Sequence, residues 1–287
     1  MHTTRRSFIK KTTLSVGAAI ALMQLPNELL AAAKANDIPL GFQTFPIRDM
    51  LGKDFSGTLK TMAGMGYKLT ELCSPKGYEQ IGFGFLTNMK TADIKKTIND
   101  AGLECPSCHF GYGELFDEAK LNESIQFAHD MGLTQMICST FWLPKTATLD
   151  DYLAAADKLN KAAEKIKAAG MQTGFHNHEF EFAMLDNQLI YDALMKRFNA
   201  DLVKMQFQTE VINLGYKAAD YFKKYPGRFI SSHLSDWTAD KKEVPIGKGV
   251  IDWKEFFAAA KTGGVKNFFV EMDFENFKDS VPYIHSL

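Results

Sequence analysis

The sequence predicts an α/β protein with a single (β/α)8 TIM barrel preceded by an export signal. After residue 36, eight short runs rich in β-branched and aromatic residues alternate with amphipathic helical runs of about ten to twenty residues. No Pro- or Gly-rich linker divides the chain, and no Gly-x-Gly-x-x-Gly follows the first predicted strand, as an open nucleotide-binding sheet would require. The 252 residues after position 35 match the length of one such barrel.

Residues 1–35 have the order of a bacterial export signal. Arg5 and Arg6 precede an apolar stretch, residues 14–23, and small residues follow at 31–35. The arginine pair with its Phe-Ile-Lys continuation resembles the twin-arginine type. The apolar run is about half of the roughly 20 residues that a membrane-spanning helix needs, and no Cys follows it for a lipid anchor. We therefore expect a soluble periplasmic protein without a membrane anchor.

The eight predicted strands and the helices between them follow in regular order. The strands are expected at residues 40–44, 68–72, 104–110, 136–140, 172–176, 203–208, 229–234 and 267–271. A capping box predicts that one helix starts at Thr148, and Thr91 is expected to cap another. Gly102, Gly132 and Gly264 lie where helices should end before the next strand. The domain prediction is thus a barrel over residues 36–287.

The charge of the predicted mature chain argues against nucleic-acid binding. Five of the 33 basic and one of the 34 acidic residues lie in residues 1–35, which leaves 28 basic and 33 acidic residues and a net charge of −5. A nucleic-acid partner would require a basic face to neutralise phosphates. With 46% apolar residues, the chain is instead expected to bury a large core.

Cys105, Cys108 and His109 form a Cys-x-x-Cys-His pattern, which is typical of covalent haem attachment. The surrounding β/α repeat disfavours haem, because c-type haem domains are small and helical and because haem is attached to unfolded chains. A zinc knuckle would need a second Cys or His pair at matching spacing, and the sequence has none. We expect either core thiols or a local disulfide, which an oxidising compartment permits.

Polar side chains gather at the predicted carboxyl ends of several strands, where the active site of a TIM barrel lies. Glu71 is expected to end the second strand and His109 the third, and the later strands end in sequences that contain His176, His233 and Glu271. Buried imidazoles and carboxylates must be paired or metal-bound. Imidazole and carboxylate together suit a first-row divalent ion, which acts as a Lewis acid on the carbonyl or hydroxyl oxygen of a sugar.

Four segments of the chain resemble the sugar phosphate isomerase/epimerase family of xylose isomerase-like TIM barrels. They are Phe-His-Asn-His-Glu-Phe-Glu-Phe at 175–182, His-Leu-Ser-Asp at 233–236, Ile-Gly-Lys-Gly-Val-Ile-Asp-Trp at 246–253 and Phe-Val-Glu-Met-Asp at 269–273. The resemblance covers essentially the whole mature chain. The wider group of xylose isomerase-like barrels includes tagatose 3-epimerases and inosose dehydratases, with endonuclease IV as a distant relative. This chain resembles an exported His-Asn-His subgroup that is similar to 3-keto-glycoside lyases.

The resemblance implies one divalent metal ion held by residues on the last four strands. His233 and Glu271 carry over directly, and His176 stands where epimerases have Glu. The strand-six Asp is missing. Gln208 takes its place if the strand is aligned without a gap, whereas Glu210 takes it in another alignment; we favour Gln208 because Glu210 should lie past the strand end. The imidazole-rich set favours Zn, Co, Ni or Mn.

The predicted chemistry begins by removing a proton beside a carbonyl. His178 is predicted to take this proton, because an unperturbed imidazole has a pKa of about 6.5, close to the working pH, or else to orient the sugar hydroxyl. His109 and Glu71 are expected to assist. Residues predicted to contact the substrate are Gln43, Trp142, Asp236 and Lys248.

The reaction itself is open between three alternatives. Two-base epimerases of the family use glutamates on strands five and eight, and His176 replaces the first of these. A single-base elimination therefore fits best: a 3-keto-glycoside lyase that removes the C2 proton and cleaves the C1–O bond to release the aglycone. A keto-sugar isomerase or epimerase is the second interpretation, and a sugar-binding barrel without catalysis is the third. All three need a small-molecule sugar or glycoside as partner.

Overall fold

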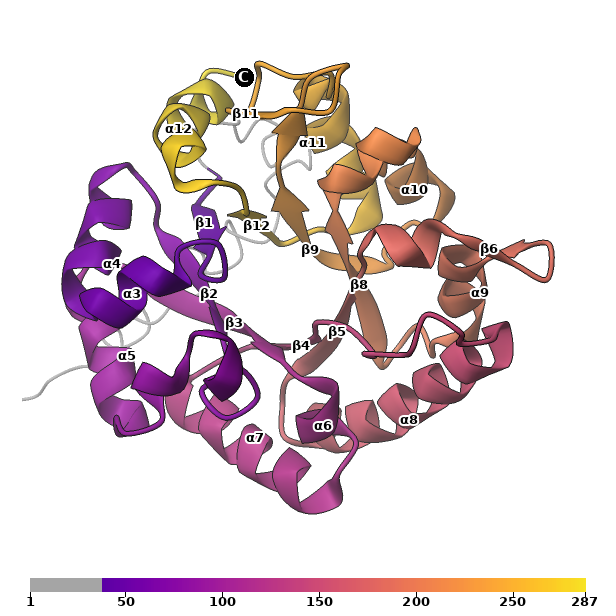
Figure 1. The fold of residues 1–287 in the computed structure, drawn as a ribbon, viewed down its shortest axis with the longest axis horizontal. Coiled ribbons are helices and arrows are strands. Elements are labelled where there is room, and N and C mark those ends of the chain that lie inside the picture. The colour runs from indigo at the N-terminus through magenta and orange to yellow at the C-terminus, as the bar shows by residue number, and fades with distance from the viewer. Residues whose placement is uncertain (1–37) are drawn as a thin grey trace, which may run out of the picture. The chain divides into compact units, whose positions relative to one another are not determined.

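Eight parallel strands close into a barrel that is surrounded by helices, as Figure 1 shows for this computed structural model. The strands are β1 Leu40–Gln43, β2 Leu69–Cys73, β3 Glu104–Phe110, β4 Gln135–Cys138, β5 Gln172–His176, β8 Val203–Gln208, β9 Phe229–Leu234 and β12 Asn267–Val270. Each strand pairs with the next one along the chain, and β1 pairs with β12 to complete the circle. The predicted TIM barrel is confirmed.

The structure describes residues 38–287, so the predicted export signal lies outside the described residues. Pro39–Leu287 form one compact unit, in agreement with a single barrel. Among the described residues, no helix is both long enough and apolar enough to cross a membrane.

The helices confirm most of the predicted boundaries. They are α3 Arg48–Lys53, α4 Phe55–Gly64, α5 Thr91–Asp100, α6 Tyr112–Leu115, α7 Glu118–Met131, α8 Leu149–Ala168, α9 Ile190–Arg197, α10 Ala218–Lys224, α11 Trp253–Gly263 and α12 Phe277–His285. Thr148 forms the predicted capping box at the start of α8, and Gly132 and Gly264 follow α7 and α11 with left-handed backbones. The predicted Thr91 cap is wrong: Lys90 occupies the cap position, and Thr91 is already the first helical residue.

In the lower barrel interior, apolar side chains from neighbouring strands pack directly against the backbone of two glycines. A Cβ atom on Gly41 of β1 would lie 2.4 Å from a ring carbon of Phe269, and one on Gly174 of β5 would lie 2.4 Å from the end of Ile137. Only glycine leaves space for these side chains at the crowded centre of the barrel. Polar side chains occupy the positions nearer the carboxyl ends of the strands, so the apolar residues support them from below.

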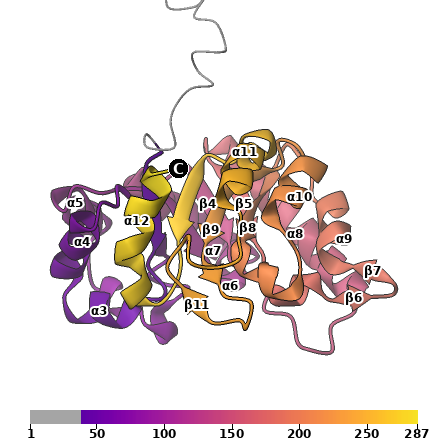
Figure 2. The same cartoon turned by 90° about the horizontal axis from the view of Figure 1, so that it is seen from above.

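Short elements follow the carboxyl ends of the strands. They include the hairpins β6 Met184–Leu185 with β7 Gln188–Leu189 and β10 Asp236–Trp237 with β11 Glu243–Val244. Five 3₁₀-helices, η2 Glu79–Ile81, η3 Gly84–Leu86, η4 Glu179–Phe182, η5 Thr209–Leu214 and η6 Phe274–Asn276, complete the described elements. Figure 2 shows β11, α6 and the β6–β7 hairpin at the same end of the barrel. The loops at this end shape the site described next.

Candidate active site

Glu71 is the centre of a buried hydrogen-bond network inside the barrel. Its side chain is fully buried. Ser107 Oγ and Gln206 Nε2 donate to Glu71 Oε1 at 2.5 and 2.8 Å, while His233 Nε2 and Gln43 Nε2 lie 2.5 and 3.2 Å from Oε2. Glu71 was expected at the end of its strand, but β2 continues to Cys73. Its carboxylate therefore forms the floor of the site rather than part of the rim.

The carboxylates of Glu71 and Glu271 hold the imidazole of His233 from both sides. Glu271 Oε2 lies 2.7 Å from His233 Nδ1. Burial alone lowers the pKa of His233, but Glu271 and Glu71 raise it more, to about 10. Burial likewise raises the pKa of Glu71, yet His109 and His233 lower it further, so that it lies well below its usual range. In this arrangement His233 is an imidazolium held between two carboxylates, so a metal ion would bind it only at a ring nitrogen that has given up its proton.

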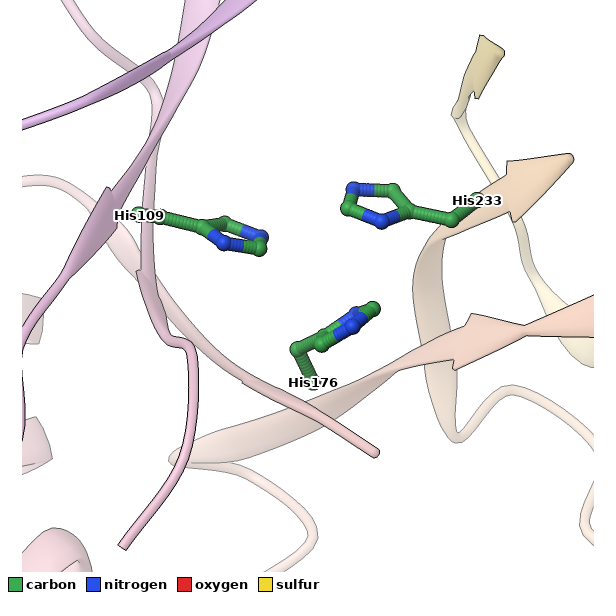
Figure 3. Close-up of side chains that lie close together, drawn as sticks. All are labelled: His109, His176 and His233. Atoms are coloured by element: carbon green, nitrogen blue, oxygen red, sulfur yellow. The ribbon is translucent and has the colours of Figure 1, made fainter. Parts of the chain in front are cut away.

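Three imidazoles from three strands meet above this floor, as Figure 3 shows. His109 comes from β3, His176 from β5 and His233 from β9. Each offers a ring nitrogen, and these nitrogens lie within 4.8 Å of one another. His109 Nε2 also lies 2.7 Å from Gln206 Oε1 and 3.2 Å from Glu71 Oε2. His109, which was predicted as a catalytic helper, is therefore part of the same cluster as two predicted metal ligands.

The donors of this cluster fit a divalent transition metal. His176 Nδ1 is buried without a hydrogen-bond partner, and burial holds the pKa of His176 well below its usual range, so the ring is a neutral nitrogen donor. Gln208 Nε2 donates to Glu271 Oε2 at 2.6 Å, which places both beside His233. The four predicted ligands thus lie together. Glu210 lies past the end of β8, in η5, as expected.

The loop after β5 holds the predicted base, His178. Its ring stacks on Phe180 with the centroids 5.0 Å apart, and it meets the His176 ring edge-on at 4.7 Å. His178 Nδ1 is buried and has no partner. Burial lowers the pKa of His178 to about 4, so the expectation of a pKa near 6.5 is wrong. The ring is a neutral proton acceptor at pH 7, although a weaker one than expected.

A fully buried carboxylate, Glu181, supports this loop from behind. Its Oε2 accepts a hydrogen bond from the backbone amide of His178 at 2.8 Å, and its Oε1 has no partner. Burial raises the pKa of Glu181 to about 8. Glu181 thereby fixes the backbone that carries His178. Its position in the His-Asn-His-Glu-Phe-Glu segment was visible in the sequence, but its inward direction was not.

A pocket of about 690 Å³ opens above the cluster. His109, His176, His178 and Glu271 form its polar end. Its apolar lining includes Phe45, Tyr78, Ile81, Trp142, Leu143, Pro144, Phe180, Leu185 and Ile190. The volume and the mostly apolar walls with a few convergent polar groups are typical of a small-molecule site.

The four predicted substrate contacts lie in different environments. Gln43 is fully buried beside Glu71, and Lys248 is exposed in a loop. Asp236 is fully buried and accepts from the amides of Gly247 and Gly249 and from Trp253 Nε1, so it holds its own loop together. Of the four, Trp142 lines the pocket, with 66% of its surface exposed.

Sequence reasoning missed Gln206 and Ser107 as members of the floor. The available signal was strand alternation, because each lies two residues before a predicted site residue, Gln208 or His109. The same alternation places Cys108, the residue before His109, on the opposite face of the strand. Cys105 and Cys108 are both free, so the local disulfide is not formed.

Comparisons with known proteins agree with this architecture. The sequence profile described as "Xylose isomerase-like TIM barrel" matches residues 59–283. A structure described as a sugar phosphate isomerase/epimerase from Parabacteroides distasonis is 23% identical, with a TM-score of 0.73, over 89% of this chain and 96% of that one. The predicted class, a carbohydrate isomerase, epimerase or lyase, agrees with this profile and this relative.

Two further structures of this fold contain metal ions. A xylose isomerase-like TIM barrel protein from Mycobacterium smegmatis in complex with magnesium is 14% identical, with a TM-score of 0.66, over 88% of this chain and 97% of that one. The IOLI protein with a bound zinc atom is 13% identical, with a TM-score of 0.61, over 87% and 94%. At these identities the likeness shows the fold. No curated protein sequence matches this chain.

Proposed function

The chain belongs to the xylose isomerase-like TIM barrel family, and we propose that it enolises keto sugars in the periplasm as a 3-keto-glycoside lyase. One observation carries this proposal: His178, a neutral imidazole whose buried Nδ1 has no hydrogen-bond partner, lines the same pocket as His109 and His176 of the three-histidine cluster and Glu271. The N-terminal sequence supports the location, since phosphorylated sugars are mostly cytoplasmic and an exported enzyme would meet free sugars and glycosides.

The reaction consists of one proton transfer and one bond cleavage. His178 takes the proton from C2 of the sugar, and the electrons of that C–H bond move toward the carbonyl oxygen at C3 to give an enolate. The enolate then forms a double bond between C1 and C2 and expels the aglycone oxygen from C1. The proton finally passes to that oxygen, so an alcohol and an unsaturated keto sugar are formed.

The remaining residues of the site position these groups. His176 and His233, together with Glu271 or His109, would hold the metal ion, and Glu71 fixes His233 from below. When bound, a divalent ion supplies positive charge beside a developing oxyanion. Glu181 keeps the His178 backbone in place through its amide. The apolar walls of the pocket exclude water around the sugar and leave space for an aglycone.

A keto-sugar isomerase or epimerase is the second candidate. The observation that favours it is the sugar phosphate isomerase/epimerase from Parabacteroides distasonis, which shares the fold over almost its whole length. Both candidates begin with the same proton transfer. They differ in whether the enolate is reprotonated on carbon or loses the group at C1.

One experiment separates the candidates. Purified protein loaded with Mn²⁺ or Zn²⁺ is incubated with 4-nitrophenyl 3-keto-β-glucopyranoside in deuterated water, while nitrophenol release and deuterium at C2 are followed. A lyase releases nitrophenol, whereas an isomerase or epimerase incorporates deuterium without release. The wild-type protein showing neither change would contradict both candidates.

The His178→Ala variant tests the assigned base. We expect it to lose both release and exchange while keeping its metal. His129→Ala on the exposed surface of α7 serves as the matched control and should behave like the parent. If His178→Ala keeps exchange but loses metal, the roles of His176 and His178 are reversed.

A further inference from the structure

A second cavity, of about 700 Å³, lies beside the first and has no part in the proposed reaction. It is bounded by the loops that follow β2 and β3 and by helices α5 and α7. One side chain, Trp142, lines both cavities. The segment around Ser74–Gly77 lines the second cavity, and Tyr78, the next residue, lines the first. The two cavities are therefore neighbours with a shared wall.

The lining of the second cavity contains a buried, hydrogen-bonded glutamate, Glu114. Glu114 is 8% exposed, and its Oε2 accepts from Ser74 Oγ at 2.6 Å and from the amide of Gly111 at 2.8 Å. A Cβ atom on Gly77 would lie 1.9 Å from the same oxygen, so the backbone approaches the carboxylate as only glycine allows. Glu114 also caps helix α6, which has only four residues.

The remaining lining combines apolar surfaces with hydrogen-bonding groups. The half-buried Phe127 and Met89 supply apolar surface over the buried Phe110 and Leu86, and polar groups come from Lys76, Thr87, Lys120, Glu123 and Gln126. A sugar ring presents this same combination, with hydroxyl groups at its edge and C–H groups on its faces. The volume is also within the range of small-molecule sites.

Trp142 is held between the cavities at a conformational cost. Its φ is +51°, in the left-handed region that bulky side chains rarely adopt, and 66% of its surface is exposed. Such strain persists where the surrounding structure maintains it, and it is concentrated at binding sites. An exposed indole at this position offers a flat surface for stacking against a ring.

We propose that the second cavity binds the second, non-reacting ring of a two-ring glycoside, with Trp142 beside the bond that joins the two rings. This inference rests on the proposed function for the statement that the reacting sugar occupies the first pocket. The second ring is a polyhydroxylated ring, either another sugar or a phenolic ring. Glu114 and the Lys76–Glu123 ion pair, whose Nζ and Oε2 lie 2.7 Å apart, all line the cavity and would bind its hydroxyl groups.

A substitution at Gly113 should affect the second cavity without affecting the first. It lines this cavity and does not line the first, and a Cβ atom placed on it would meet nothing within 4 Å. Gly113→Phe should therefore be accommodated without distorting the backbone, and we expect its ring to occupy part of the cavity that Gly113 lines; Gly113→Ala is the matched control. Neither residue change touches the proposed catalytic groups.

Binding is measured by calorimetry with unreactive ligands, so the result does not depend on turnover. Cellobiose and arbutin represent a sugar and a phenolic second ring, and methyl β-glucoside represents one ring. We expect the metal-loaded wild type and Gly113→Ala to bind cellobiose or arbutin about tenfold or more tightly than methyl β-glucoside. Gly113→Phe should remove that preference and leave methyl β-glucoside within about twofold. No preference in the wild type, or an unchanged preference in Gly113→Phe, would overturn the proposal.

The fluorescence of Trp142 gives a second readout. The chain has three tryptophans. Trp253 is buried, Trp237 is half-buried and Trp142 is the exposed one, so quenching by acrylamide reports mainly on Trp142. The two-ring ligand should reduce this quenching in the wild type and not in Gly113→Phe, with Trp142→Phe as the blank. Equal protection in Gly113→Phe would place the second ring elsewhere.

Discussion

The floor of the barrel and the segment at the end of β5 differ in whether their buried polar groups have hydrogen-bond partners. On the floor, the carboxylate of Glu71 has four hydrogen-bonding partners from four other strands. In residues 176–181, four buried polar atoms have no partner at all: His176 Nδ1, Asn177 Nδ2, His178 Nδ1 and Glu181 Oε1. Among the residues that the structure describes, nine buried side-chain atoms have no partner, so nearly half of them lie in this one segment, from the last residue of β5 to Glu181.

This difference distinguishes polar groups that hydrogen-bond within the protein from polar groups whose partner would be a ligand. Buried polar groups cost free energy unless they are paired, so a satisfied network is part of the folded core. Unpaired groups gathered in one loop beside a pocket indicate a place where a metal, a substrate or water completes the hydrogen bonding. Changes on the floor should therefore affect stability first, and changes in the loop should affect binding and turnover first.

The largest expected effect is that of Glu71→Ala. The substitution leaves His233, Ser107 and Gln206 with unpaired groups in the barrel interior, which should lower the free energy of unfolding by about 3–5 kcal/mol. Urea unfolding of the metal-free protein measures this change. Glu123→Ala on the exposed surface is the control, because its ion pair with Lys76 is open to solvent. Equal midpoints for the two variants would contradict the structural role of the floor.

The next effect separates two imidazoles of the same cluster. His176→Ala should reduce the metal content from about one ion per chain to almost none, because it removes a neutral donor with a free nitrogen. The metal-free His176→Ala protein should nevertheless remain more stable than His233→Ala, since both nitrogens of His233 bind carboxylates. Elemental analysis and unfolding in chelator test both statements. Wild-type protein that binds no metal would contradict the first, and the reverse order of stability the second.

A smaller, pH-dependent effect is expected for Glu181→Gln. Because burial raises the pKa of Glu181 to about 8 in the folded protein, its neutral form stabilises the fold fully below the unfolded value near 4.5, and this stabilisation is lost as the pH rises to about 8. Gln cannot ionise, so the gain in melting temperature over the wild type should grow from pH 5 to pH 8. The exposed Glu179→Gln should show no such trend. A constant difference across this range would contradict the assignment.

The smallest effect is expected from the thiols near the floor. Burial raises the pKa of Cys105 to about 12, so this thiol stays protonated, and Cys108 is fully buried. Cys105→Ser and Cys108→Ser should leave turnover within about threefold of the parent, because neither thiol lines the pocket. Absorbance of a covalently bound haem in the parent protein would overturn this view.

The strand pattern could be predicted closely, and the depth of the side chains could not. Strands β3, β5, β8 and β9 have the predicted boundaries, because the regular alternation of strand-like and helical segments marks where each strand lies. Alternation shows which face a residue occupies but not how far along the barrel it lies. Glu71 was therefore placed at the rim, and Gln206 was not recognised as its partner.

Side chains that bind backbone amides were also hidden from the sequence. Asp236 follows a strand like a substrate ligand, yet apart from the next amide its hydrogen-bond donors lie 11 to 17 positions later. Only the folded loop brings these donors together. Trp142, in contrast, lies in a loop whose apolar neighbours line the pocket, so its predicted place at the pocket agrees with the structure.

The contacts of Asp236 make the segment between Trp237 and Trp253 a closed unit that is fastened at its base. One carboxylate accepts from the amides of Trp237, Gly247, Gly249 and Ile251 and from the Trp253 indole, while the tip around Thr238–Lys242 is exposed. Residues can be inserted at the tip without disturbing the fastening, since lengthening an exposed loop costs little closure entropy. The tip is therefore the position at which a peptide tag or a new recognition sequence could be displayed while the barrel keeps its shape.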